Sequence, residues 1–235
     1  MIDIENWMQE YQKIIVNNFG NRVLFIGLQG SYARKEPTER SDIDVVLILD
    51  KVNIDDLMIY KNIVEKLPHR ELLCGFVSGR DEIACWSKYD LFQFYFDTIA
   101  VIGNLETIIP ELTVEDAKQA VLVGACNIYH ACIHNFLHTT DVDTLQLLYK
   151  SAFFVMQANQ YCKTGIYVRS RSTMQEFIEE KDKPVFQVLT NQLSINQDNF
   201  QRCSEILLEW SGNLIRQYGR NEHNLSELSL IVNKG

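Results

Sequence analysis

The chain has 235 residues, of which 46% are hydrophobic and 23% are charged, and its formal net charge is −9. This composition is ordinary for a globular protein, and the length suits two modest domains. The negative charge disfavours long nucleic acids as partners, because their affinity depends on Lys and Arg side chains that neutralise phosphates. No apolar run approaches the roughly 18 residues of a membrane-spanning helix, so we expect no membrane span.

The start of the chain and its cysteines suggest a cellular location. The residues MIDIENWMQEYQK are acidic and amphipathic, without the basic start and apolar middle of a signal peptide. Six cysteines are scattered without a C-x-x-C pair, which favours reduced thiols over disulfides. We therefore expect a cytoplasmic protein.

The first hundred residues alternate between helical and strand patterns. Two continuous apolar runs of strand length are typical of strands that are covered on both faces. The second predicted helix has Ile54, Leu57, Met58 and Val64 at the spacing of one face, and Pro68 ends it. The predicted elements are a helix over 3–18, strands over 22–29 and 43–50, a helix over 53–67 and a strand over 71–79.

Residues 90–103 leave two alternatives open, because their aromatic side chains favour a strand while a helix leading into a short strand also fits. After Pro110 every pattern is helical, beginning with a capping box formed by Thr113 and Asp116. The chain therefore divides into an α/β part over 1–105 and an all-helical part over 110–235.

Three more signals mark helices in the second part. A helix over 143–163 is closed by Gly165, a typical C-terminal cap. Ser172 and Gln175 form another capping-box pattern. A further helix is predicted over 198–218, with Gly219 at its end.

Two carboxylates stand at the start of the second predicted strand, in the segment GSYARKEPTERSDID. Asp42 and Asp44 point the same way from a strand, roughly 6–7 Å apart. Two carboxylates this close repel each other, and a hard divalent cation removes that cost. Mg²⁺ binds one or two carboxylates together with substrate phosphates. The pattern therefore predicts a magnesium site at Asp42 and Asp44.

The segment that follows the first predicted strand supplies an anion site. A strand that ends in Gly30-Ser31 and turns into a short helix exposes backbone N–H groups. Glycine permits close approach of a phosphate, and the Ser31 hydroxyl can add a hydrogen bond. Arg34 and Arg40 provide positive charge nearby. The segment lacks the G-K-[ST] of a P-loop.

These residues together resemble a known signature. Gly30-Ser31, Ala33-Arg34 and Ser41-Asp42-x-Asp44 look like the motif of the polymerase-beta-like nucleotidyltransferase superfamily. A mixed-sheet head and a helical tail are similar to the layout of its aminoglycoside nucleotidyltransferase branch. The resemblance implies an α+β fold, with a mixed β-sheet and helices followed by an all-α helical bundle. Position 35, often Gly in this family, is Lys here, which implies either a strained backbone or a different turn.

The resemblance also implies the roles of the site residues. Asp42 and Asp44 would bind Mg²⁺, and Gly30 and Ser31 would hold the β- and γ-phosphates of a nucleoside triphosphate. A third carboxylate is expected on a neighbouring strand, with Glu71 as the first choice and Asp97 as the alternative. In similar proteins a lysine of the helical tail reaches over the triphosphate, and Lys150 is the candidate here, although a solvated helix lysine fits equally well.

We therefore expect an Mg²⁺-dependent enzyme that transfers a nucleoside monophosphate from ATP or another NTP onto a hydroxyl of a small molecule bound between the two domains. An aminoglycoside-like antibiotic suits the acidic charge, and the protein would be a monomer or homodimer. Two alternatives stay open: a toxin–antitoxin or protein- or RNA-modifying nucleotidyltransferase, and a nucleotide-binding sensor without catalysis.

Overall fold

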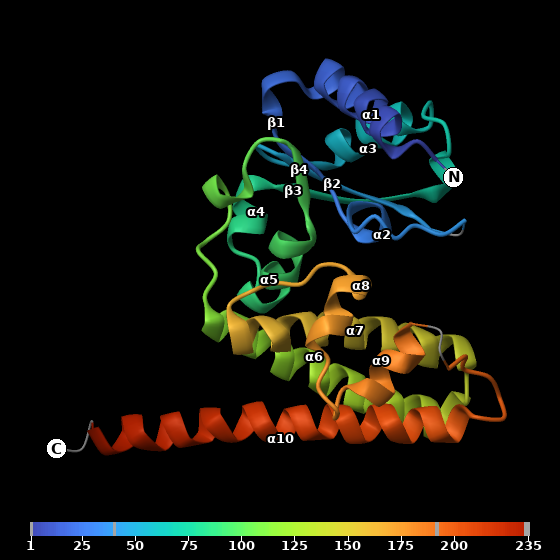
Figure 1. The fold of residues 1–235 in the computed structure, drawn as a ribbon. Helices are drawn as coiled ribbons and strands as arrows, with labels where there is room; N and C mark the ends of the chain where they lie inside the picture. Colours follow the sequence, from blue (N-terminus) through green and yellow to red (C-terminus); the bar gives the residue numbers. More distant parts are fainter. Residues whose placement is uncertain (1, 40, 191–192, 233–235) are drawn as a thin grey trace. The chain divides into compact units, whose positions relative to one another are not determined.

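A computed structural model describes residues 2–39, 41–190 and 193–232, with side chains described up to residue 220. The chain forms two compact units, Met1–Glu111 and Leu112–Gly235 (Figure 1). The first unit combines a sheet with helices, and the second is helical where it is described. The α+β fold expected from the sequence is confirmed.

The first unit follows the predicted order of elements. The segment over 90–103, which the sequence left open, is a helix followed by a short strand. The helices and strands are α1 (Ile4–Phe19), β1 (Val23–Leu28), α2 (Gly30–Ala33), β2 (Ile43–Leu49), α3 (Ile54–Val64), β3 (Leu73–Gly79), α4 (Arg80–Ala84), α5 (Lys88–Asp97) and β4 (Ile99–Ile102), with single 3-10 turns at η1 (Gly20–Arg22), η2 (Arg70–Leu72) and η3 (Leu105–Thr107).

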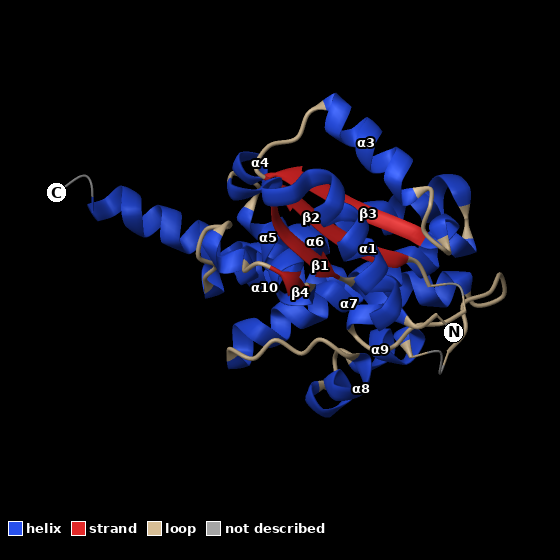
Figure 2. Cartoon of the chain, turned by 90° about the horizontal axis from the view of Figure 1, so that it is seen from above, coloured by secondary structure: helices blue, strands red, loops and turns tan. Residues whose placement is uncertain are grey.

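The four strands form one mixed sheet in the order β3-β2-β1-β4, which Figure 2 shows from above. β1 is antiparallel to both β2 and β4, and β2 is parallel to β3. Both central strands are almost fully buried, as their continuous apolar sequences predict. The pairing of these two buried strands positions the residues that follow β1 next to those at the start of β2.

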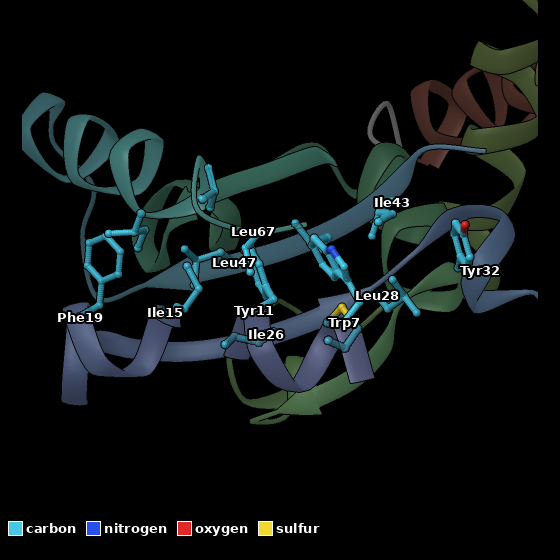
Figure 3. Packing of buried hydrophobic residues seen from close by; sticks show 14 of the residues in the cluster. Trp7, Tyr11, Ile15, Phe19, Ile26, Leu28, Tyr32, Ile43, Leu47 and Leu67 are labelled. Atoms are coloured by element: carbon cyan, nitrogen blue, oxygen red, sulfur yellow. The ribbon is translucent and has the colours of Figure 1, made fainter. Parts of the chain in front are cut away.

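One face of the sheet carries the main hydrophobic core of this unit. The buried residues of α1 recur about every four positions and pack against side chains of β1 and β2 (Figure 3). The Trp7 indole donates a hydrogen bond to the Pro68 carbonyl over 2.7 Å, which fixes the turn after α3 against α1. Each fully buried large apolar side chain contributes about 1.5–3 kcal/mol, so this face contributes strongly to the stability of the unit.

The predicted inward face of α3 is wrong. Ile54 is 70% exposed and Met58 59%, and of the four residues assigned to that face only Val64 is buried. The helix is instead rotated so that Asp56 and Ile63 point inward. The cause is polar, because Asp56 accepts hydrogen bonds from Arg22 Nη1 over 2.6 Å and from Arg22 Nη2 over 2.9 Å. Helical periodicity cannot detect such a pairing.

This ion pair makes the stability of the first unit depend on pH. The hydrogen bond from Arg22 holds the pKa of Asp56 below its ordinary value of 3.8. The stabilisation is therefore present above that value and is lost as the pH falls through the lower folded-state pKa. We expect Asp56→Asn to lower the melting temperature by several degrees near neutral pH, since it replaces a charge-assisted bidentate pair.

Thermal melts of both proteins at about pH 7 and about pH 3 measure this contribution. The gap between their melting temperatures should be smaller at the lower pH, because the stabilisation is lost as the pH falls from 3.8 through the lower folded-state pKa of Asp56. Asp55→Asn is the matched control, because the neighbouring Asp55 is exposed. A gap of equal size at both pH values would contradict the assignment.

The second unit is built on three long helices. The order of elements is α6 (Val114–His134), a π-helical turn η4 (Asn135–Thr139), α7 (Val142–Thr164), α8 (Arg171–Met174), a 3-10 turn η5 (Gln175–Phe177), α9 (Lys183–Leu189) and α10 (Phe200–Val232). The Thr113–Asp116 capping box opens α6, and Gly165 closes α7 with a φ of 71°, both as predicted.

Two sequence-based predictions in this unit are wrong. The cap of α8 is Ser170, whose side chain accepts from the Thr173 N–H, and not Ser172. Gly219 does not end α10, which continues to Val232. A mid-helix glycine costs about 1 kcal/mol, and the buried stripe of α10 that precedes it outweighs this cost.

One described helix, Val114–Thr139, is long and apolar enough to cross a membrane by length and composition, with a mean hydropathy of 1.3. A single such helix is weak evidence, because core helices of soluble proteins pass the same test. Its buried positions Ala117, Val121, Ala125 and Ile128 lie on one face, and the helix packs against α7 and α10. This packing accounts for the apolar residues on that face of α6.

A buried hydrogen bond ties α10 to α7. The Tyr218 hydroxyl donates to Asn159 Oδ1 over 2.6 Å, and both residues are buried. We expect Tyr218→Phe to reduce the free energy of unfolding by about 1–3 kcal/mol, since it leaves a buried amide oxygen without this donor. Chemical denaturation checks this value, with Tyr129→Phe, an exposed tyrosine of α6, as the control. Equal effects of the two substitutions would contradict the prediction.

Candidate functional site

The ends of all four strands meet at one edge of the sheet. Leu28, the last residue of β1, pairs with Val45 near the start of β2 and with Ile99 at the start of β4. Ile43 at the start of β2 pairs with Leu73 at the start of β3. The residues after β1 and those before β2, β3 and β4 are therefore brought to the same edge, although they are far apart in sequence.

Asp42 and Asp44 lie at this edge, where β2 begins. Asp42 is exposed and Asp44 is partly buried. Burial raises the pKa of Asp44 above its ordinary value, and the negative charge of Asp42 raises it further. Arg34 and a hydrogen bond from Cys74 act in the opposite direction. The charge of Asp42 thus disfavours the ionised form of Asp44, a cost that a cation would relieve.

The turn after β1 is packed directly against Asp44. The Gln29 N–H donates to the Asp44 carbonyl over 2.7 Å, which joins the two strands at this edge. Gly30 has a φ of +69°, in the left-handed region that favours glycine. A Cβ at Gly30 would lie 1.8 Å from Asp44 Oδ2. Only glycine lets the turn and this carboxylate approach so closely.

Ser31 lies in the first turn of α2, as the sequence predicts. The first N–H groups of a helix have no partner within the helix, so the N–H groups of this turn are suited to bind an anion. Lys35, which follows α2, has a φ of 61°. The left-handed backbone therefore persists at this position without glycine, and the first of the two alternatives for Lys35 is correct.

Arg34 faces a buried acid. Its Nη1 lies 3.7 Å from Asp97 Oδ2, and both side chains are largely buried. Gln29 extends the same contact region, because its Nε2 donates to Thr98 Oγ1 over 2.6 Å and to the Phe94 carbonyl over 3.1 Å. Arg34 thus ties the α2 turn to the end of α5 while its charge acts on Asp44. Arg40 lies outside the described residues.

The two candidates for a third acid lie apart from each other. Glu71 is on the turn η2 before β3, with a side chain that is 73% exposed and 3.9 Å from His69 Nδ1. Asp97 is buried at the end of α5 beside Arg34. In the part of the chain that the structure describes, no three His, Cys, Asp or Glu side chains form a group that could hold a metal ion. A third ligand among them stays a prediction.

Cys74 is the site residue that the sequence did not reveal. It pairs in register with Asp44 across the parallel strands β2 and β3. Burial and the charges of Asp44 and Asp42 raise the pKa of the thiol. A cysteine within an apolar run has the sequence signature of a core residue. Only the strand register identifies its partner.

Lys150 is an exposed residue of α7 in the second unit. Its proposed role at a triphosphate therefore stays a prediction.

Asp42 and Asp44 fit a hard divalent cation. Two carboxylates within interaction distance, a raised pKa at Asp44 and a glycine turn against its oxygen form a compact set of oxygen donors. Mg²⁺ takes one or two carboxylates and completes its octahedron with water and phosphate oxygens. The adjacent N–H groups of α2 suit those phosphates, so the arrangement can bind a metal–polyphosphate ligand.

Comparison with known proteins agrees with this chemistry. The family model described as "Nucleotidyltransferase domain" matches residues 8–99. A relative from Methanocaldococcus jannaschii, named "Putative protein adenylyltransferase MJ1379", is 35% identical over 65 residues, which are 28% of this chain. The match spans 63% of the length of that relative.

A solved structure shares the fold over most of the chain. It is the spectinomycin adenyltransferase AAD(9) from Enterococcus faecialis with ATP and spectinomycin. The TM-score is 0.57 at 12% identity, and the alignment covers 89% of this chain and 98% of the other. At this identity the likeness concerns the fold alone. Residues 8–99 of this chain therefore match a nucleotidyltransferase domain, and the chain shares its fold with a solved adenyltransferase.

Proposed function

We propose that the chain transfers AMP from ATP to a hydroxyl group of a small molecule in an Mg²⁺-dependent reaction. The observation that carries the proposal is the contact of the Gly30 turn with Asp44, where a Cβ would lie 1.8 Å from the carboxylate oxygen. This contact supports the proposal, because a metal–triphosphate ligand requires an anion-binding turn beside a cation-binding carboxylate.

Each part of the site has a distinct role in this proposal. The N–H groups of the Gly30-Ser31 turn bind the β- and γ-phosphates, and Asp42 and Asp44 hold the cation. Mg²⁺, when bound, neutralises charge on the triphosphate. The acceptor oxygen forms a bond to the α-phosphorus, the bond from that phosphorus to the bridging oxygen breaks, and pyrophosphate leaves. The acceptor proton passes to solvent or to a base.

The small-molecule acceptor is supported by two observations. The chain shares its fold with an enzyme whose structure holds ATP and spectinomycin. The formal net charge of −9 suits a cationic acceptor, because opposite charge favours encounter. An antibiotic acceptor of this kind would make the protein a resistance enzyme.

Pyrophosphate release tests the proposal. The protein is incubated with Mg²⁺, each of the four NTPs in turn, and a panel of hydroxylated amines, with chelator in place of Mg²⁺ as control. We expect release with ATP, dependent on both metal and acceptor. ATP binding without turnover for any acceptor would contradict the enzyme and favour a nucleotide-binding sensor.

A protein acceptor is the second candidate, favoured by the curated relative named as a protein adenylyltransferase. The two candidates differ in where the label goes when ATP carries it on the α-phosphate. Label in a small product requires a small-molecule acceptor, whereas label that remains in the protein fraction after denaturation requires a protein acceptor. Mass spectrometry of that fraction then identifies the modified residue.

A further inference from the structure

The side chain that β3 presents opposite Asp44 is a thiol. Asp44 and Cys74 are paired across the parallel strands, so their side chains leave the same face of the sheet. Cys74 is exposed at this edge. Its neighbours Leu73 and Gly75 point to the opposite face. Cys74 is thus the residue from β3 that adjoins the carboxylate pair.

A thiol here changes what the site offers to a cation. Mg²⁺ and Mn²⁺ favour oxygen ligands, and carboxylates suit them better than sulfur. The sulfur of Cys74 therefore stands where an oxygen ligand would suit these ions better. Among the described residues no third acid completes a metal-binding group. β3 therefore supplies a thiol, and not a third carboxylate, beside Asp44.

We propose that Cys74 limits the metal affinity of this site, and that a carboxylate at position 74 would complete it. The inference rests on the proposed function, because it takes Asp42 and Asp44 as the cation ligands. It adds a specificity-determining residue on a third element, β3, to those on β2 and the α2 turn. In the wild-type site, much of the affinity for the cation then comes from the phosphates of the bound nucleotide.

The test is direct binding of Mn²⁺, followed by electron paramagnetic resonance, with the full chain and without nucleotide. The variants are Cys74→Asp and, as a longer alternative, Cys74→Glu. Cys85→Asp is the matched control, because Cys85 is also an exposed thiol of the first unit and the change in charge is the same. Cys74→Ser keeps a small neutral donor. Circular dichroism confirms that each variant folds.

We expect Cys74→Asp or Cys74→Glu to tighten Mn²⁺ binding by about tenfold or more relative to Cys85→Asp, since the added charge lies beside the ion. Cys74→Ser should stay within about threefold of wild type, because a hydroxyl also adds no charge. Adding ATP should narrow the difference between wild type and the aspartate variant, since phosphate oxygens supply the missing ligands.

The outcomes distinguish the inference about Cys74 from the assignment of Asp42 and Asp44 as cation ligands. One outcome is that both Cys74 carboxylate variants bind Mn²⁺ no more tightly than Cys85→Asp, while wild-type binding depends on Asp44. This outcome would overturn the inference about Cys74 and leave the proposed function standing. Wild-type Mn²⁺ and Mg-ATP binding that is unaffected by Asp44→Asn would overturn the metal assignment itself. If one carboxylate variant fails to fold, the other decides the result.

Discussion

Asp44→Asn should reduce metal-dependent pyrophosphate release by more than about a hundredfold, because under the proposed function it removes a charged ligand of the cation. The substitution keeps the volume of the side chain and its contact with the Gly30 turn. We therefore expect the loss to come from binding and chemistry and not from the fold.

The stability of the same variant should change in the opposite direction. Burial and the charge of Asp42 raise the pKa of Asp44, so the ionised form is disfavoured in the folded protein. Above the folded-state pKa this charge costs stability, and a neutral amide removes the cost. The melting temperature of metal-free Asp44→Asn near neutral pH should equal or exceed that of wild type. Such a trade between stability and activity is typical of functional sites.

Melting curves and pyrophosphate release measured on the same preparations check both halves of this prediction. Asp42→Asn should lose activity in the same way. Asp81→Asn is the control, because Asp81 is an exposed acid on α4. Full activity in Asp44→Asn would refute the metal assignment, and a melting temperature well below that of wild type would refute the electrostatic account.

Gly30→Ala should strongly reduce the activity of the protein. The new Cβ would stand 1.8 Å from Asp44 Oδ2 and 2.8 Å from Asp44 Cγ, so the turn or the carboxylate must move. A displacement of about 1 Å at a reacting site can cost a hundredfold in rate, and we expect a loss of activity of about that size. A left-handed alanine adds a further cost of about 1–2 kcal/mol to folding.

A double-mutant cycle separates these two costs. Gly165→Ala measures the backbone cost alone, because Gly165 has a φ of +71° and no atom within 4 Å of a built Cβ. Gly30→Ala should destabilise wild type more than Gly165→Ala does. In an Asp44→Ala background most of this excess should disappear, since the clashing carboxylate is gone and only the Cβ at 3.2 Å remains. An excess that persists in that background would show that Asp44 is not the obstacle.

The sequence predicts those parts of the fold that local rules control. The strands β1 and β2 are continuous apolar runs, and the caps of α6 and α7 are local hydrogen-bond patterns within a few residues. Patterns of this kind depend on neighbours in the chain and are therefore visible in it. The helical face of α3 and the continuation of α10 through Gly219 depend on partners far away in sequence, namely Arg22 for α3 and the packed helices for α10.

The same distinction applies to the candidate site. Gly30, Ser31, Asp42 and Asp44 flank two consecutive strands, so a short motif contains them all. Cys74 and Asp97 reach this edge of the sheet only through the register of β3 and through the Arg34 contact. Residue type alone could not identify Cys74, because a cysteine in an apolar run resembles a core residue. The acid that precedes β3 in sequence, Glu71, lies on an exposed turn.

The pairing of β1 with β4 determines where this chain can be shortened. The family match ends at residue 99, the first residue of β4. A chain cut there would leave β1, whose side chains are mostly buried, with an open row of N–H and C=O groups along one side. Exposed apolar edges of this kind pair with other chains and aggregate. The smallest fragment that keeps its sheet closed on this side therefore has to extend at least through Ile102.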